Sequence, residues 1–311
     1  MGPVLVTGAG GFAGGHLVEH LLDEHTEVAA WSNPASPSPA SAPRVSWQAV
    51  DILDRSAVVQ TIAELRPSAI YHCAGVADVG GSWAEPERAL KVNVLGTHHL
   101  VDAVRLAQLE SPVLVTGSAL IYRPSLGAID EESPIGPNSP YGVSKLTQEM
   151  LARSLPSALI ARPFNHAGPR QTDAYSTSSF ARQIASIEAG LSSPVLRVGN
   201  LDSRRDITDV RDIVRAYRLL IERGTRCRPY NVCSGTAYRI GDLLDLLVGM
   251  ARVKVTITPD PARARPSDNP VVLGDRSRIT AETGWMPLIS IERTLSDLLE
   301  YWRQRLASPT A

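Results

Sequence analysis

The sequence predicts an α/β protein, with a doubly wound parallel sheet and a smaller C-terminal α/β lobe. Two observations support this prediction. Short apolar runs alternate with longer segments of helical periodicity through the first half of the chain, which is typical of a parallel sheet covered by helices on both faces. After Asn165 the alternation becomes less regular, as expected where a second lobe interleaves with the last strands of the first.

The first half of the chain supplies most of the predicted sheet. Its helical segments carry apolar residues on one face, as Leu17, Val18, Leu21 and Leu22 do in the first of them. A stretch rich in Pro and Ser at residues 33–44 lacks periodicity and predicts a loop. The predicted strands lie at residues 3–8, 27–33, 45–52, 69–75, 112–118 and 158–165, and the helices at 15–24, 55–65, 86–109 and 140–155.

The second half mixes elements of both lobes. Helical patterns occur at residues 180–190, 210–224, 239–251 and 294–307, and strand patterns at 195–199, 230–235 and 253–258. The run at 230–235 predicts the last strand of the large sheet. We therefore expect residues 1–165 and about 197–235 to form the larger domain, and residues 166–196 and 236–311 to form the smaller lobe.

Composition limits the classes of function. Of the 311 residues 43% are apolar and 20% charged, so a packed interior is expected. The formal net charge of −1 predicts no general attraction to nucleic acid or to an anionic membrane. No apolar stretch approaches the roughly 20 residues of a membrane helix, and the N-terminus lacks the regions of a signal peptide. Cys73, Cys227 and Cys233 are too scattered for a disulfide framework or a metal site, which favours reduced thiols in a cytoplasmic protein.

Three glycines follow the first predicted strand and open the first helix. Gly8, Gly11 and Gly14 permit a tight turn and let a pyrophosphate approach the backbone, where the helix N-terminus supplies N–H donors. A tight turn without a ligand would look similar, but the position in the first strand–helix unit favours a dinucleotide. The sequence therefore predicts a Rossmann-type NAD(P)-binding domain.

The end of the second predicted strand bears on the choice of dinucleotide. A carboxylate there would hold the 2′-hydroxyl of NAD, and a nearby Arg the 2′-phosphate of NADP. Here the residues are Trp31, Ser32 and Asn33, which include neither. Because no acid repels a phosphate, we favour NADP(H), with NAD(H) as the alternative. Asp51 and Ile52, after the third strand, are expected to contact the adenine, although an ordinary helix start would also explain them.

A hydroxyl, a phenol and an amine form the predicted catalytic set. Tyr141 and Lys145 share a helix face at i and i+4, and Ser118 ends the preceding strand. An ammonium near the phenol lowers the pKa of that phenol and can also bind the nicotinamide ribose. The phenol could then exchange a proton with a carbonyl oxygen that the Ser118 hydroxyl also holds. These residues predict hydride-transfer chemistry at a carbonyl.

Together these residues resemble the short-chain dehydrogenase/reductase superfamily in its extended, nucleotide-sugar-modifying form. The stretches "HCAG", "NVLGT" and "RPFNHAGP" agree with it. In the second half, "VGNLDSRRDITDVRDIVRAY", "YNVCSG", "RPSDNPVVLGD" and "ETGWMP" are similar to the branch of GDP-mannose 4,6-dehydratases and GDP-4-keto-6-deoxy-mannose reductases. The similarity extends over essentially the whole chain, and residues 199–212 are its most specific part.

The resemblance implies further site residues. For the cofactor, it adds residues beside the nicotinamide and residues at the ends of the strands. For the sugar nucleotide, it adds arginines that would bind the diphosphate and polar groups that would bind the ribose and the sugar. The implied cofactor contacts are Phe12, Cys73, Ala74, Gly75, Asn93, Pro163 and Phe164. The implied substrate contacts are Ser82, Asn165, Arg182, Asn200, Arg205, Arg265 and Asp268.

One position separates the reactions of this branch. In the dehydratases that the chain resembles, a Glu two residues after the strand-end hydroxyl protonates the leaving hydroxyl during water elimination. Here that position is Leu120, which cannot donate a proton, so reduction or epimerisation at C4 is expected. Glu131 and Glu132 lie farther along in a polar loop, and a substitute role for one of them stays open.

We therefore expect an NADPH-dependent reductase that converts GDP-4-keto-6-deoxy-D-mannose to a GDP-6-deoxyhexose such as GDP-D-rhamnose. A 4-epimerase with tightly bound NAD is the alternative; a 4,6-dehydratase and a non-catalytic NADP-binding protein are less favoured. The base of the nucleotide is left open by the sequence, with GDP favoured. No metal, nucleic acid or membrane partner is expected. The resemblance also implies a homodimer through a four-helix bundle that is built from the helices near Pro86 and Tyr141.

Overall fold

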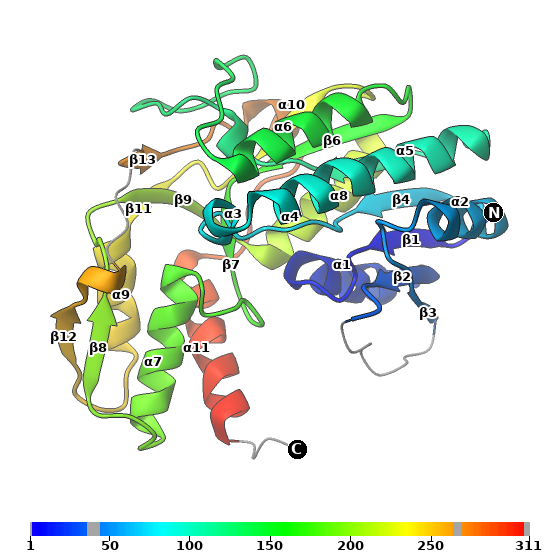
Figure 1. Ribbon diagram of the computed structural model, residues 1–311. Helices are drawn as coiled ribbons and strands as arrows, with labels where there is room; N and C mark the ends of the chain where they lie inside the picture. Colours follow the sequence, from blue (N-terminus) through cyan, green and yellow to red (C-terminus); the bar gives the residue numbers. More distant parts are fainter. Residues whose placement is uncertain (1, 36–43, 264–268, 308–311) are drawn as a thin grey trace.

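The structure is a computed structural model that describes residues 2–35, 44–263 and 269–307. It has two lobes: the larger one contains the long sheet, and the smaller one extends to one side of it (Figure 1). The elements of the larger lobe are β1 (Val4–Thr7), α1 (Phe12–Asp23), β2 (Val28–Ser32), β3 (Val45–Ala49), α2 (Arg55–Leu65), β4 (Ala69–His72), α3 (Gly81–Ala84), α4 (Pro86–Leu90), η1 (Lys91–Leu95), α5 (Gly96–Leu106), β5 (Val113–Thr116), η2 (Ala119–Ile121), α6 (Pro140–Ala152), β6 (Ala158–Pro163), α8 (Val210–Arg223), β10 (Pro229–Val232) and α10 (Ser277–Thr283).

A seven-stranded sheet in the order β10-β6-β5-β4-β1-β2-β3 forms the centre of the larger lobe. Every neighbouring pair in it is parallel. The chain runs from β1 outward to β3 and then returns to β4 on the other side of β1, so the strand order reverses between β1 and β4. Ligands of such sheets bind at this reversal, beyond the carboxyl ends of the strands. The predicted Rossmann-type sheet is confirmed.

Side chains alternate between the two faces of this sheet, and each face is covered by its own helices. Val6 packs with α1 and α8, whereas its neighbour Leu5 packs with α2, α5 and α6. Leu114 and Val113 divide in the same way on β5. Burial on both faces explains why these strands are continuously apolar in the sequence.

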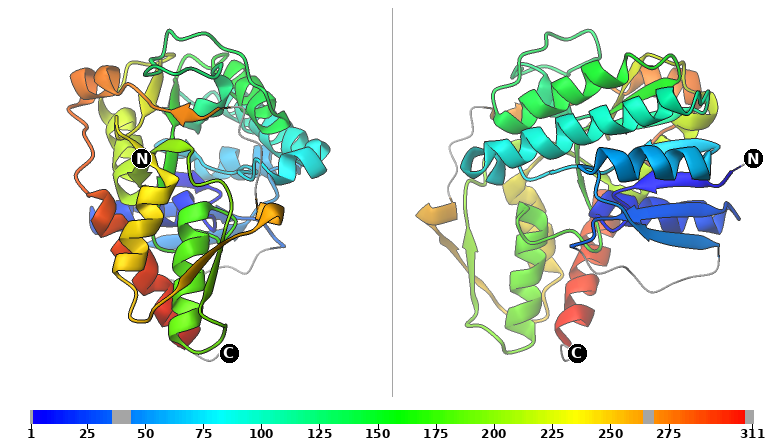
Figure 2. Two further views of the ribbon diagram at one scale, coloured as in Figure 1. Left: turned by 90° about the vertical axis from the view of Figure 1, so that its left-hand side faces the viewer. Right: turned by 45° about the vertical axis from the view of Figure 1, so that its right-hand side comes forward.

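The predicted helix at residues 86–109 is interrupted near its start. It consists of α4, one turn of π-helix (η1) and α5, which lie beside α6 along the sheet (Figure 2). The Thr97 hydroxyl donates a 2.7 Å hydrogen bond to the Asn93 carbonyl at this turn. Turns of this kind often occur at functional sites, and this one carries a residue that the sequence assigned to the cofactor.

The smaller lobe packs three helices against short strands. Its apolar core joins α7, α9 and α11 and includes Phe180, Ile184, Leu196, Leu244 and Leu299. One small sheet contains β11-β9-β13, with β7 also paired to β9, and the other contains β12-β8. The elements are β7 (Asn165–Ala167), α7 (Ser176–Glu188), β8 (Val195–Val198), β9 (Arg204–Asp209), β11 (Ala237–Arg239), α9 (Ile240–Gly249), β12 (Thr256–Pro259), η3 (Pro261–Arg263), β13 (Val271–Val272) and α11 (Ile291–Ala307).

The domain boundaries stay a proposal, which the strand pairing refines. The sequence placed residues from about 197 in the larger domain. Because β8 and β9 pair within the small sheets, we propose that the second segment of the larger domain begins at Val210 instead. Residues 277–283 (α10) return to pack with α8 and β10, so we propose that they also belong to the larger domain.

Candidate active site

The glycine-rich turn sits at the reversal point of the sheet and leaves no room for side chains. Gly8 has a φ of +67°, and a Cβ there would lie 2.6 Å from the Ala74 nitrogen. A Cβ on Gly14 would lie 2.2 Å from the Gly8 carbonyl oxygen, and one on Gly11 3.1 Å from the same oxygen. Helix α1 then begins with neither a side-chain cap nor an acidic residue in its first turn. The turn and the helix N-terminus therefore fit a dinucleotide diphosphate.

The end of β4 is held against this turn by a buried chain of hydrogen bonds. The Ala74 N–H donates to the Thr7 hydroxyl (3.2 Å), which lies 2.8 Å from Nδ1 of His72. On the other side of the ring, Nε2 of His72 lies 2.9 Å from the Thr97 hydroxyl, which donates to the Asn93 carbonyl. Burial lowers the pKa of His72 to about 3, so the ring is neutral. This chain joins β1, β4 and the π-helical turn, and sequence reasoning missed it.

Asn93 connects the π-helical turn to the loop after β4 and to the catalytic helix. Its Oδ1 accepts a 2.8 Å bond from the Val76 N–H, and its Nδ2 donates to the Val76 carbonyl and to Ser144 Oγ on α6. A Cβ on Gly75 would lie 2.8 Å from Asn93 Oδ1 and 3.5 Å from Lys145 Nζ. The predicted cofactor residues at 73–75 and Asn93 are therefore brought together beside Lys145.

Ser118, Tyr141 and Lys145 meet beyond the carboxyl end of β5. Ser139 caps α6 by accepting a hydrogen bond from the Gly142 N–H, so Tyr141 lies in the first turn of the helix. The Tyr141 side chain is hydrogen-bonded to the Ser118 side chain. Lys145 Nζ lies 5.9 Å from the centre of the Tyr141 ring and donates to the Thr116 carbonyl (2.8 Å) and to Gln148 (2.9 Å). The structure brings the three predicted catalytic side chains together.

The expected effect of Lys145 on the phenol is not the dominant one. Burial raises the pKa of Tyr141 to about 12, and the hydrogen bond from Ser118 only partly opposes this rise. Burial also lowers the pKa of Lys145 to about 8. Desolvation outweighs the attraction that the sequence argument invoked, because both groups are nearly fully covered by protein. The phenol is therefore protonated at neutral pH, as a proton donor must be.

Leu120 and the two nearby acids decide which reactions the site can catalyse. Leu120 lies two residues after Ser118, in the short helix η2 that Ser118 caps. The Leu120 N–H donates a hydrogen bond to Ser118 Oγ (3.1 Å). The Glu131 carboxylate accepts a 2.8 Å bond from the Asn231 N–H at the far edge of the sheet, and Glu132 pairs with Arg278 at 2.6 Å. Both acids thus have partners away from the catalytic hydroxyl. The arrangement suits proton donation to a carbonyl rather than expulsion of water.

The residues predicted for the adenosine half occupy loops after β2 and β3. Asn33 is exposed, and its side chain accepts a bond from the Ala35 N–H (2.8 Å). A Cβ on Gly10 would lie 3.7 Å from the Ser32 Cβ, so the β2 end adjoins the glycine turn. Asp51 Oδ1 accepts from the Leu53 N–H (2.9 Å), while Ile52 is buried against Gly96. Their contacts with a nucleotide stay predictions.

The remaining predicted neighbours of the nicotinamide approach from β6 and α1. Phe164 is buried beside Ala119 and Ile121, next to the catalytic strand end, and follows Pro163. The Phe12 ring stacks on His166 of the smaller lobe, with centres 5.7 Å apart. Nδ1 of His166 also donates a 3.1 Å hydrogen bond to the Phe164 carbonyl.

The predicted substrate residues are less uniformly placed. Ser82 is buried: its Oγ donates to the Val79 carbonyl and accepts from the Tyr141 N–H, so it supports the catalytic helix. Arg205 lies on β9, where it bonds the Arg204 and Pro270 carbonyls and burial lowers the pKa of its guanidinium. Arg182 pairs with Asp173 and lies 5.7 Å from the ring centre of Trp302. Asn165 and Asn200 are exposed, and Arg265 and Asp268 lie outside the described residues.

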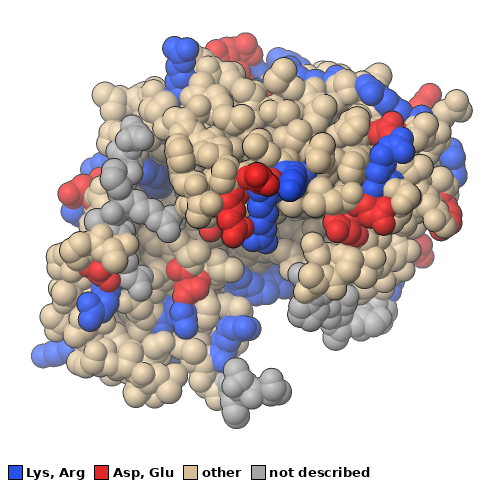
Figure 3. Space-filling model, viewed as in Figure 1, with Lys and Arg blue, Asp and Glu red and all other residues tan. Residues whose placement is uncertain are grey.

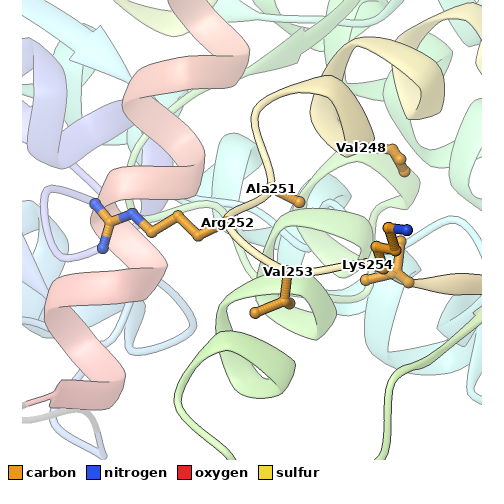
Figure 4. A pocket seen from close by; sticks show the side chains of 6 residues that line it. Val248, Ala251, Arg252, Val253 and Lys254 are labelled. Carbon is orange, nitrogen blue, oxygen red and sulfur yellow. The ribbon is translucent and has the colours of Figure 1, made fainter.

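The space between the lobes forms a hollow on the face shown in Figure 3, with acidic and basic side chains at its rim. A second, shallow hollow lies between α9 and β12 and is lined by residues 248 and 251–255 (Figure 4). In Figure 4 the Arg252 side chain points toward α11, where its Nη2 lies 3.8 Å from Glu300. No predicted catalytic residue lines this second hollow.

Within residues 2–35, 44–263 and 269–307, no three His, Cys, Asp or Glu side chains are grouped so that they could hold a metal ion. Over the same ranges no helix combines the length and the apolar character needed to cross a membrane. The three cysteines are free thiols.

The fold and the site together define a class: an NAD(P)-dependent enzyme of the extended short-chain dehydrogenase/reductase type. Residues 5–298 match the family described as GDP-mannose 4,6 dehydratase, and the chain belongs to this family. It is 36% identical to GDP-6-deoxy-D-mannose reductase of Pseudomonas aeruginosa, over 97% of this chain and 98% of that protein. It is 25% identical to a GDP-mannose 4,6-dehydratase of Vibrio cholerae, over 80% of this chain and 76% of that protein.

Solved structures agree with this assignment. RMD from Pseudomonas aeruginosa complexed with NADPH matches with a TM-score of 0.85 and 34% identity, over 98% of this chain and all of that one. UDP-glucose 4-epimerase of Thermotoga maritima with UDP-glucose matches with a TM-score of 0.86 and 25% identity, over 97% and 99% of the two chains. The predicted superfamily and enzyme class are confirmed, as is the prediction of NADP(H) with NAD(H) as the alternative.

Proposed function

We propose that this protein is an NADPH-dependent reductase that converts GDP-4-keto-6-deoxy-D-mannose to GDP-D-rhamnose or its C4 epimer. A dinucleotide whose diphosphate is bound at the glycine turn would place its nicotinamide beside Tyr141 and would supply the hydride for C4 of the sugar. Tyr141 donates the proton to the C4 oxygen, while Ser118 binds the same oxygen. Lys145 holds the nicotinamide ribose beside the phenol.

The observation that carries this proposal is the apolar side chain of Leu120 beside the catalytic hydroxyl. A dehydratase needs an acid at this place to expel water from the sugar. Glu131 and Glu132, the acids that could have replaced it, are held by Asn231 and Arg278 instead. Burial keeps Tyr141 in the protonated form, which ketone reduction requires because it takes a proton from the phenol.

The choice of substrate rests on the relative named GDP-6-deoxy-D-mannose reductase and on the arginines of the smaller lobe. Arg205 is a charged group in a half-covered place, which suits one phosphate of a nucleoside diphosphate. Arg265 and Asp268 are proposed to complete the nucleotide site. A thermal-shift comparison of GDP, CDP, dTDP and UDP would identify the base, with GDP expected to stabilise the protein most.

The direct test is incubation of the protein with the 4-keto sugar nucleotide and NADPH. We expect one NADPH to be oxidised for each ketone reduced, with the product identified by NMR. Absence of cofactor oxidation under conditions in which GDP binds would reject the proposal.

A 4-epimerase that keeps NAD and returns the hydride to the other face is the second candidate. The similarity to UDP-glucose 4-epimerase of Thermotoga maritima favours it, since the two chains share the fold over almost their full lengths. Denaturing freshly purified protein and analysing the released nucleotides separates the two. Retained NAD would favour the epimerase, and a preparation that releases no dinucleotide would favour the reductase. The dehydratase and the non-catalytic binding protein stay less favoured, because Leu120 replaces the acid and the catalytic side chains are assembled.

We also propose a homodimer through a four-helix bundle. Large apolar side chains are exposed along η1, α5 and α6: Leu95 is 46% exposed, Leu106 58%, Val143 44% and Met150 65%. Two copies of these helices packed face to face would cover them. Light scattering should give twice the chain mass, and Val143→Glu with Met150→Glu should give monomers. Leu288→Glu, at a side chain 71% exposed elsewhere, is the control that should leave the mass unchanged.

With free thiols and NADPH as reductant, we place the enzyme in the cytoplasm.

A further inference from the structure

Tyr175 reaches from the smaller lobe to the larger one. It immediately precedes α7, and its hydroxyl donates a 3.2 Å hydrogen bond to the carbonyl oxygen of Ala77, 98 residues earlier in the chain. Ala77 lies in the stretch of residues 76–82 (the 76–82 loop), which follows β4 and ends in the first turn of α3. The side chain is half-buried. Sequence reasoning did not single out this tyrosine, because nothing in the local pattern indicates a partner so distant.

The turn that carries Tyr175 is firmly attached to the smaller lobe. The Gln171 amide donates to the His166 carbonyl (2.7 Å), and the Ser178 hydroxyl donates to the Gln171 carbonyl (2.7 Å). Trp302 of α11 donates through Nε1 to the same Ser178 hydroxyl (3.0 Å). These bonds tie the turn to β7, α7 and α11, so Tyr175 moves with the lobe.

The loop that receives this bond is attached to the catalytic groups. Asn93 bonds both the N–H and the carbonyl of Val76, directly before Ala77. At the other end of the loop, Ser82 Oγ donates to the Val79 carbonyl and accepts the Tyr141 N–H. The Ala77 carbonyl therefore lies between two residues that support the cofactor loop and the catalytic helix.

The electrostatics agree with this geometry. Burial and the nearby Asp78 carboxylate raise the pKa of Tyr175, so its phenol keeps the proton that it donates to Ala77. Tyr175 is also close enough to Tyr141 to contribute to the raised pKa of the catalytic phenol, after burial.

We propose that Tyr175 is a positioning residue: its hydrogen bond to Ala77 holds the smaller lobe against the 76–82 loop, so that a sugar nucleotide bound by the smaller lobe is brought to Ser118 and Tyr141. The part that concerns the sugar rests on the proposed function, whereas the contact between the lobes does not. The variant Tyr175→Phe removes the hydroxyl and keeps the ring. Tyr301→Phe, a half-buried tyrosine on α11 of the same lobe, is the matched control.

The first measurement needs no substrate. Amide hydrogen exchange of residues 76–82 is followed in the wild-type protein and in both variants. We expect exchange in this loop to be about two- to tenfold faster in Tyr175→Phe, as the loss of one hydrogen bond predicts, and unchanged in Tyr301→Phe. Equal exchange in the wild type and Tyr175→Phe, or an equal increase in both variants, overturns the contact as a restraint.

The second measurement uses the ketone and NADPH. In Tyr175→Phe the KM for the sugar nucleotide should rise about two- to tenfold, while the Kd for NADPH and the thermal midpoint match those of Tyr301→Phe. An unchanged KM together with a loosened loop overturns the role in placing the substrate. If the wild type does not turn over the ketone, the proposed reductase function has failed, and the exchange experiment still decides whether the restraint exists.

Discussion

The catalytic residues of the larger lobe differ from the arginines of the smaller lobe in how firmly they are held. The former lie beyond the strand ends of the large sheet, and the latter lie on β9 and α7. At the strand ends, Tyr141 and Lys145 are buried and bonded to neighbours on β5 and α6. In the smaller lobe, Arg205 and Arg182 are more exposed: Arg205 donates to the Arg204 and Pro270 carbonyls, and Arg182 pairs with the Asp173 carboxylate.

This difference corresponds to two kinds of task. Proton donation needs groups fixed within fractions of an ångström, and a parallel sheet with helices on both faces provides that rigidity. Recognition of a diphosphate needs cations whose donors match the phosphate oxygens, as the guanidinium fork of Arg does. We therefore propose that the larger lobe sets the reaction type and that the smaller lobe sets the choice of nucleotide.

The largest effect is expected for Tyr141→Phe. Loss of the phenolic proton should lower kcat by about 10²-fold or more, since a general acid typically contributes that much. The ring and α6 stay in place, so the Kd for NADPH, measured by fluorescence titration, should change little. Near-normal turnover would show that Tyr141 does not donate the proton.

Lys145→Met should alter the pH dependence of stability. The folded-state pKa of Lys145, about 8, lies below its ordinary value of 10.5, so the unfolded chain binds more protons between these pH values and stability rises with pH across this window. The loss of folding free energy from burying the charged Lys145, up to about 3 kcal/mol, is fully present below pH 8. Urea unfolding at pH 7 and pH 10 should show this gain in the wild type and in the exposed control Lys254→Met, but not in Lys145→Met. Parallel behaviour of all three proteins would contradict it.

Gly8→Ala should weaken cofactor binding. The residue has a φ of +67°, and a Cβ there would lie 2.6 Å from the Ala74 nitrogen, so the turn must shift. We expect the Kd for NADPH to rise about tenfold, in line with the cost of such strain. Gly249→Ala is the control, because no atom lies within 4 Å of a Cβ at that position. Equal affinities in the two variants would place the dinucleotide elsewhere.

Arg205→Ala tests the proposed diphosphate site of the smaller lobe. Loss of a charge-assisted bond to a phosphate should raise the KM for the sugar nucleotide about tenfold, with kcat nearly unchanged. Arg182→Ala should raise this KM less, by about threefold at most. An exposed guanidinium that already has a carboxylate partner contributes little to binding a phosphate. Arg226→Ala, at an exposed position of the larger lobe, is the neutral control. A larger effect for Arg182 than for Arg205 would reverse the assignment of the diphosphate site.

Much of the site could be read from local pattern. The glycine turn, the strand-end hydroxyl and the i, i+4 pair of Tyr141 and Lys145 follow from short-range spacing, because strand ends and helix faces are local properties. The pKa of Tyr141 could not be predicted, since burial of the phenol depends on residues that are distant in the sequence. The same is true of the chain through His72 and of the Tyr175 contact.

By itself, the sequence determined the order of the strands of the large sheet, the glycine turn after the first of them and the absence of an acid at Leu120, because periodicity and residue type carry this information directly. It did not indicate the short strands β7, β9, β11 and β13 or the helix α10. Only the tertiary structure decided which strands β8 and β9 pair with, how Glu131 and Glu132 are engaged, and that burial raises the pKa of the catalytic phenol. These outcomes depend on desolvation and on contacts between segments about a hundred residues apart, which no local pattern records.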